Sequence, residues 1–342
     1  MARPTRSPPT TPSSTGPRTA GWRWCSPRPR KPRERAPIAR PEFLTESRLS
    51  ESGRAAAFRE KIIDEIFYAL GLSRTGPGRR LLGPVFRPVA GRFSRIAARA
   101  DGEVLSSGLS GGARRILPDL SLHPAPRGAE TIPRDGPLLL VANHPGGFDS
   151  VAVLASVPRK DMKVFISDGP FTRAFPFAKR YFIYTPMTVV GGQAALRSGV
   201  EHLQGGGALL IFPHHEVEPD PELGPGAAEA IGDWSRSVEI MLRRVPQTRL
   251  QAVIASGVLM PKFLRNPLLR IRKEPARRQK LAEVMQIVRQ MLFPRSVRVD
   301  IHVSFGRPVE ATALAQDELM ADVIRIARGL LDDHMASLRT SS

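Results

Sequence analysis

The stretch PLLLVANHPGGFDSVAVLA, residues 137–155, sets the pattern on which the rest of the chain is built. Its first six residues form an unbroken apolar run, which is typical of a strand buried on both faces of a sheet. Residues 150–155 have the apolar composition of a helix start, and the glycine-containing turn between the two segments holds His144 and Asp149. Because α/β folds place their sites in turns at the carboxyl ends of strands, this stretch predicts an enzyme site.

Strand-like and helix-like segments alternate from residue 119 to the end of the chain. We expect strands at 119–123, 137–142, 163–166, 181–184, 208–212, 250–255 and 297–303. We expect helices at about 150–157, 170–180, 192–204, 227–245, 275–292 and 312–335. This alternation predicts an α/β fold with a largely parallel sheet flanked by helices. An N-terminal amphipathic helical hairpin is expected to precede it.

Three segments of the chain differ in composition. Residues 1–45 are rich in proline and arginine, and the first 40 hold ten Lys or Arg against one acid, Glu34. We expect this segment to be a disordered basic tail because it has too little apolar surface to offset ordering entropy. Residues 55–118 are predicted to be a helical N-terminal segment, and 119–338 the main domain.

The helical segment allows two interpretations. Apolar residues recur every three or four positions from Phe58 to Leu70, and a second pattern at about 80–106 carries arginines beside its apolar positions. An amphipathic, arginine-lined helix can lie in a membrane interface. It can equally pack on the main domain with a solvated basic face. The pattern does not favour either interpretation.

Charge and cysteine content limit the classes of function. The formal net charge is +19 over 342 residues, which favours polyanionic partners such as an anionic membrane or phosphorylated substrates. The single cysteine, Cys25, excludes a disulfide framework or a cysteine-based zinc site within the chain. No apolar run approaches the length of a membrane-spanning helix. No nucleic-acid-binding motif accompanies the basic charge, so a nucleic-acid partner is not expected.

The pair His144 and Asp149 has the composition of a general-base dyad. A histidine titrates near neutral pH, and a carboxylate on one ring nitrogen fixes its tautomer and stabilises the imidazolium. The sequence has no Gly-x-Ser-x-Gly elbow, and its only cysteine lies in the tail, so no protein nucleophile is evident. A dyad of this kind suits direct transfer to an acceptor hydroxyl. The alternative is a structural histidine beside an aspartate that caps a helix.

Five motifs resemble, in order and spacing, those of the glycerolipid acyltransferase superfamily, whose members include lysophosphatidate acyltransferases. Residues 142–149 are similar to its N-H-x4-D motif, and 128–133 to the G-x-E-x-I/L-P that precedes it. Residues 205–213 resemble the glycine and strand that lead into F-P-E-G-T-R, 252–258 the late apolar strand, and 305–309 a closing Gly-x-Pro. The resemblance implies that 119–338 is an acyltransferase domain with His144 and Asp149 as catalytic residues.

The resemblance also implies a substrate-binding set. Its members are Asn143, Gly146, Gly147, Phe212, Pro213, His214 and Glu216. The glycines are expected to let substrate approach backbone N–H groups. The F-P-E-G-T-R block reads FPHHEV at 212–217, so its glutamate is displaced and its arginine is missing. Glu216 is slightly preferred over Glu218 as the residue that takes the role of the displaced glutamate. An arginine fork suits phosphate, so the missing arginine weakens the case for lysophosphatidate as the acceptor. A different lysolipid or hydroxylated acceptor remains open. Adjacent histidines on a loop seldom ligate one ion together, so no metal is expected.

The function expected from these observations is transfer of a fatty acyl group from a thioester donor to a hydroxyl of a glycerolipid or lysophospholipid. The donor is acyl-CoA or acyl-carrier protein as co-substrate, with no other cofactor. The alternative is a non-catalytic lipid-binding relative of the same fold. The basic segment 262–280 is either a solvated face or a docking site for anionic headgroups, coenzyme A phosphates or an acidic carrier protein. We expect a cytoplasmic protein associated peripherally with an anionic membrane surface.

Overall fold

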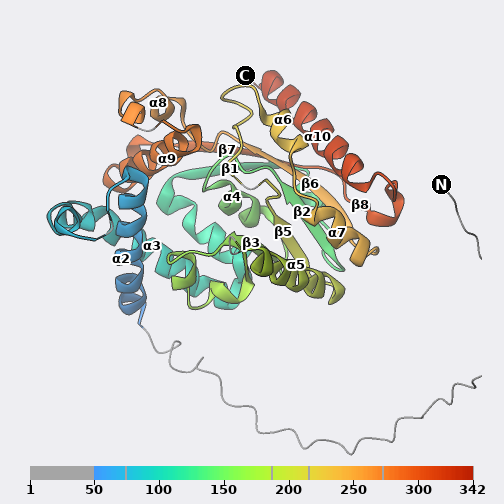
Figure 1. Cartoon of the computed structure of the whole chain (residues 1–342), viewed down its shortest axis with the longest axis horizontal. Helices are drawn as coiled ribbons and strands as arrows, with labels where there is room; N and C mark the ends of the chain where they lie inside the picture. The colour runs from blue at the N-terminus through green and yellow to red at the C-terminus, as the bar shows by residue number, and fades with distance from the viewer. Residues whose placement is uncertain (1–49, 74, 186–187, 215, 272, 342) are drawn as a thin grey trace, which may run out of the picture. The chain divides into compact units, whose positions relative to one another are not determined.

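A computed structural model describes residues 50–341 except 74, 186–187, 215 and 272 (Figure 1). The expected tail at 1–45 lies outside the described residues. The described residues belong to one compact unit. Within the described part, no helix is both long enough and apolar enough to cross a membrane.

An eight-stranded mixed sheet is the centre of the described chain, which confirms the predicted α/β class. The strands are β1 (Leu122–Arg127), β2 (Leu138–Ala142), β3 (Lys163–Ser167), β4 (Phe182–Thr185), β5 (Ala208–Ile211), β6 (Arg249–Ser256), β7 (Val299–Phe305) and β8 (Val309–Glu310). Their order is β1-β7-β6-β2-β5-β3-β4, with β8 paired to β6. Strand β6 runs antiparallel to β7 and β8, and the other pairs are parallel. The central strand β2 is thus flanked by two parallel neighbours.

Helices cover both faces of this sheet (Figure 1). They are α2 (Glu51–Leu70), α3 (Pro77–Ile116), α4 (Asp149–Ser156), α5 (Val189–Gln204), α6 (Ala227–Gly232), α7 (Ser237–Arg244), α8 (Pro261–Leu264), α9 (Pro275–Leu292) and α10 (Leu319–Ser341). All five residues of β2 are fully buried. Leu138, Leu140 and Ala142 join the core with α3 and α4, whereas Leu139 and Val141 join the core with α5, α7 and α10. The apolar run therefore reflects a strand whose alternate side chains fill two cores.

The predicted helical hairpin consists of α2 and α3. Helix α2 begins after Ser50, whose hydroxyl accepts the Gly53 N–H, and ends at Gly71 in the left-handed conformation. Its apolar face, centred on Phe58, Ile63 and Phe67, packs against α3. Helix α3 also contacts α4 and α9, so part of the hairpin packs on the main domain.

Several predicted elements have different limits in the structure. Strand β1 runs through Pro124 and Pro126, which is tolerated because β1 is an edge strand. Residues 170–180 contain short 3-10 turns at 172–174 and 178–181 instead of a helix. The helix expected at 227–245 is two helices, because the backbone N–H of Ser235 in the break between them donates to the Pro213 carbonyl.

Candidate active site

The turn that follows β2 brings His144 and Asp149 together. The carboxylate of Asp149, in the first turn of α4, is fully buried, and its Oδ2 lies 2.8 Å from His144 Nδ1. The same oxygen accepts the Gly146 N–H at 3.2 Å, and Oδ1 accepts the N–H of Ser150. Asp149 therefore fixes both the turn and the imidazole. The two side chains that the sequence analysis paired are therefore in hydrogen-bond contact.

The other ring nitrogen of His144 is placed to act as a base. With Nδ1–H donating to Asp149, Nε2 carries the lone pair. Among the described residues, no side chain hydrogen-bonds Nε2, and 29% of the His144 side chain is exposed. The ring of Phe212 packs against the imidazole with a centroid separation of 4.8 Å. The nitrogen that could accept a proton is thus free of a protein hydroxyl or thiol in the described chain.

Glu218, not the slightly preferred Glu216, is the acid that holds the histidine. Glu218 Oε2 accepts the backbone N–H of His144, and Oε1 accepts Trp234 Nε1–H at 2.8 Å. The Glu218 N–H in turn donates to the His144 carbonyl at 2.8 Å. Burial raises the pKa of the Glu218 carboxyl. Glu216 is exposed, so its side chain is not part of this arrangement.

The side chain of Asn143 holds the backbone instead of facing a ligand. Its Nδ2 donates to the Ala255 carbonyl at 2.9 Å, and its Oδ1 accepts the Ala255 N–H at 2.7 Å. The side chain is 2% exposed. It therefore continues the pairing of β2 with β6 at the point where the main chain leaves the sheet. This geometry favours a positioning role over the predicted substrate contact.

Helix α9 packs against the other side of the turn with a row of polar side chains, of which Glu283, Gln286 and Gln290 are buried. Gln279 Nε2 donates to the Pro145 carbonyl at 2.7 Å, and the Glu283 carboxylate accepts the Gly147 N–H. Gln286 bonds Val258 and Met260, and Gln290 bonds the Leu120 carbonyl. The polar residues at 279, 283, 286 and 290 share one helix face. That spacing was the sequence signal that could have pointed to Glu283.

The glycines of the turn lie close to Glu283 of α9. The N–H of Gly146 donates to Asp149 Oδ2, and that of Gly147 to the Glu283 carboxylate. A Cβ at Gly146 would lie 3.0 Å from Glu283 Oε1 and 3.2 Å from Val258 Cγ1. The missing side chain thus lets α9 approach the turn closely.

Opposing effects act on the pKa of His144. Burial lowers it, whereas the charge and hydrogen bond of Asp149 and the charges of Glu283 and Glu218 raise it, and the net direction is upward. Burial also raises the pKa of Glu283, whose Oε1 is buried without a hydrogen-bond partner among the described residues. The carboxylates around the turn therefore hold the pKa of His144 above its usual value.

The loop after β5 contains the predicted substrate-binding residues Pro213 and His214. The carbonyl of Pro213 accepts the Ser235 N–H, and His214 Nδ1 lies 2.9 Å from the Glu216 carbonyl oxygen. His214 is half-buried and does not contact His144 through a hydrogen bond in the described structure. No group of three or more His, Cys, Asp or Glu residues suited to a metal ion occurs in the part of the chain that is described.

Comparisons with known proteins give one named structural likeness. No protein-family model matches the chain, and no curated protein matches it. A solved structure that aligns with it is the 1-acyl-sn-glycerophosphate (LPA) acyltransferase PlsC from Thermotoga maritima, at 13% sequence identity and a TM-score of 0.43. The alignment covers 80% of this chain and 95% of that chain. The superfamily resemblance stays an expectation from the motifs.

Proposed function

We propose that the protein is an O-acyltransferase that moves a fatty acyl group from a thioester donor to a hydroxyl of a glycerolipid or lysophospholipid. The observation that carries the proposal is the pair of His144 and a fully buried Asp149, 2.8 Å apart, with Nε2 free of protein partners in the described chain. A base that is oriented but has no protein nucleophile suits deprotonation of a bound hydroxyl.

The proposed reaction is a direct transfer. His144 Nε2 takes the proton from the acceptor hydroxyl as its oxygen attacks the thioester carbonyl. The tetrahedral intermediate then collapses, the carbon–sulfur bond breaks, and the imidazolium returns its proton to the leaving thiolate. Asp149 holds the ring and stabilises the imidazolium throughout. The donor is acyl-CoA or acyl-carrier protein, which acts as co-substrate and not as a bound cofactor.

Exposed apolar side chains near the turn between α2 and α3 support a lipid acceptor. Leu81 and Val85 of α3 are 76% and 66% exposed, and Leu268 and Ile271, at 267–271 after α8, are 59% and 60% exposed. The two regions meet where Leu70 of α2 packs into the cluster that contains Leu269. Exposed arginines, including Arg80, Arg87 and Arg270, lie in the same segments. Apolar residues beside cations favour peripheral contact with an anionic membrane.

The test is thiol release from acyl-CoA and acyl-carrier protein with a panel of lysolipid acceptors. We expect wild-type protein to consume thioester in the presence of a lysolipid, and His144→Ala to lose at least a hundredfold in turnover. The matched control is His123→Ala, which removes an exposed histidine of β1. Wild-type turnover in His144→Ala would refute the mechanism. Vesicle binding without thioester consumption by the wild-type protein would point to a non-catalytic lipid binder.

A further inference from the structure

The loop after β5 returns to His144 in a short acidic segment, residues 218–222. Its sequence is Glu-Pro-Asp-Pro-Glu, so acids alternate with prolines. Proline has a fixed φ and carries no N–H, which limits the conformations that the segment can adopt. The side chains of Glu218 and Asp220 are buried, at 1% and 4% exposure. The acidic segment therefore turns its first two carboxylates into the protein.

The first acid of this segment holds the backbone of His144. The Glu218 N–H donates to the His144 carbonyl at 2.8 Å, and Glu218 Oε2 accepts the His144 N–H. His144 lies two residues beyond the last residue of β2, Ala142. Both backbone polar groups of His144 are thus bound by one residue of the acidic segment, and the place of His144 depends on where that segment lies.

Asp220 fastens the acidic segment to the residues that follow β6. Its Oδ1 accepts the N–H groups of Glu222 and Gly257 at 3.0 and 3.2 Å, and its Oδ2 accepts the Val258 N–H at 3.1 Å. A carboxylate suits this place because it offers two acceptor oxygens, whereas the amide of asparagine offers one. Burial raises the pKa of Asp220 to about 6, so these bonds form against a cost of desolvation.

Glu222 adds a third contact, on the side of β7. Its Oε1 accepts the hydroxyl of Ser256, the last residue of β6, and lies 2.8 Å from Nδ1 of His302 in β7. The Ser256 hydroxyl also lies 2.7 Å from Nε2 of His334, a buried residue of α10. The acidic segment is therefore tied to His144 at one end and to β6 and β7 at the other.

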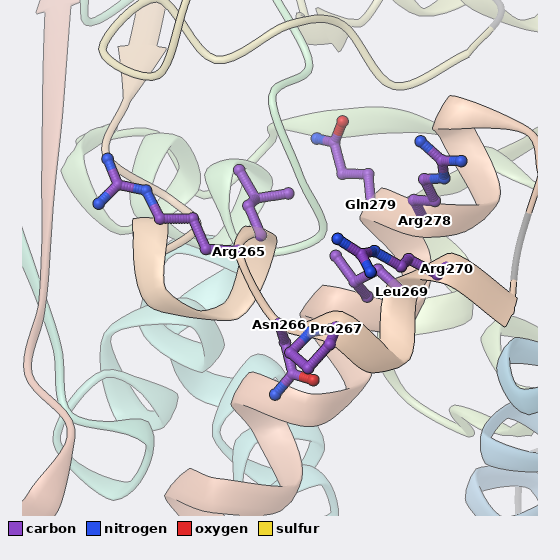
Figure 2. Close-up of a pocket in the computed structure, with 8 residues that line it drawn as sticks. Arg265, Asn266, Pro267, Leu269, Arg270, Arg278 and Gln279 are labelled. Atoms are coloured by element: carbon purple, nitrogen blue, oxygen red, sulfur yellow. The ribbon is translucent and has the colours of Figure 1, made fainter.

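Asp220 also acts on the turn that follows β2 from its other side, through Val258. A Cβ at Gly146 would lie 3.2 Å from Val258 Cγ1, so Val258 packs closely on the turn. Helix α9 is less closely packed at Gln279, whose amide donates to the Pro145 carbonyl at 2.7 Å but whose side chain also lines a hollow of about 430 Å³ (Figure 2). At this part of the turn, the closer packing comes from a residue that Asp220 holds.

We propose that Asp220 is a positioning residue of the acyl-transfer site, which holds the acidic segment and Val258 in place and so fixes the backbone of His144 and the direction of its Nε2. In the described chain no hydrogen bond joins Asp220 to His144, so it acts through Glu218 and Val258. The hydrogen bonds stand on the geometry, and their role in catalysis rests on the proposed function. A base displaced by about 1 Å can lose about a hundredfold in rate.

The test replaces Asp220 with asparagine in the full chain, which keeps the size of the side chain but removes one acceptor oxygen. The matched control is Asp322→Asn, because Asp322 also accepts a backbone N–H, that of Ala315 at 2.9 Å, but lies in the first turn of α10. The second variant is Glu222→Ala. Glu222 is exposed, so its replacement should leave folding intact.

Two readouts are taken from each variant. The first is the fluorescence of Trp234, whose Nε1–H donates to Glu218 at 2.8 Å, with Trp22 and Trp24 replaced by phenylalanine so that Trp234 is the only tryptophan. The second is kcat and KM in the thiol-release assay, with kcat expressed per folded molecule from circular dichroism. A loss of stability alone lowers the folded fraction and leaves kcat per folded molecule unchanged.

We expect Asp220→Asn to move the Trp234 emission to longer wavelength and to lower kcat about tenfold or more, with KM changed by less than about twofold. Glu222→Ala should change both readouts in the same direction by less, and Asp322→Asn should match the wild type.

The proposal is overturned if kcat of Asp220→Asn stays within about twofold of wild type, if KM rises instead, or if kcat falls while the Trp234 emission is unchanged. If Asp220→Asn does not fold, Glu222→Ala decides by the direction of the same two readouts. A wild-type protein that consumes no thioester would refute the acyl-transfer function itself, and the catalytic role of Asp220 with it, even where the emission shift is seen.

Discussion

Replacing Asn143 with alanine tests whether this residue holds the sheet or contacts substrate. The substitution removes two hydrogen bonds, of 2.9 and 2.7 Å, to the carbonyl and N–H of Ala255. Asn143 is 2% exposed and Ala255 fully buried, so both backbone groups lose their partner where water has little access. An unsatisfied buried group costs about 1–3 kcal/mol, so the free energy of unfolding should fall by about 2–6 kcal/mol.

The assay is equilibrium urea unfolding followed by circular dichroism, with Asn266→Ala as control. Asn266 is half-buried and accepts one local N–H, from Leu268 at 3.0 Å, so its replacement should cost about 1 kcal/mol or less. The reasoning is refuted if Asn143→Ala unfolds with wild-type free energy and yet loses acyl transfer. That result would make Asn143 a substrate contact.

Two further predictions concern pH. Glu283→Gln should move the acidic limb of the kcat/KM profile to lower pH, because the charge of Glu283 raises the pKa of His144 and the base acts only when neutral; a limb that stays in place or moves upward would contradict this. Burial lowers the pKa of His334 to about 4, so the unfolded chain binds its proton first as the pH falls below 6.5. The free energy of unfolding should therefore drop by up to about 3 kcal/mol between pH 6.5 and 4, and His334→Gln should remove that part of the drop. Urea unfolding across this range checks it, and an unchanged pH dependence in the variant would count against the assignment.

Much of the fold could be predicted from local pattern. The apolar run of β2 and the alternation of strands and helices are consequences of burial on both faces of a parallel sheet, and the structure confirms them. The pairing of His144 with Asp149 could also be anticipated, because a short turn keeps the two side chains within reach.

Contacts between distant segments were not predictable in the same way. The choice between Glu216 and Glu218 depends on Trp234, which donates to Glu218 from beyond α6. The role of Asn143 depends on a strand more than 100 residues away, and that of Glu283 on how closely α9 approaches the turn. In each case the partner is set by tertiary packing, which local sequence spacing does not encode.

The most direct measurement of the central claim mixes acyl-CoA with the wild-type protein, first without and then with the lysolipid acceptor that supports turnover. Thiol release and intact-protein mass are followed together. Direct transfer to a hydroxyl deprotonated by His144 predicts no thiol burst and no added mass without acceptor, and one thiol per ester formed once acceptor is present. A stoichiometric thiol burst with an acylated protein in the absence of acceptor would contradict the account.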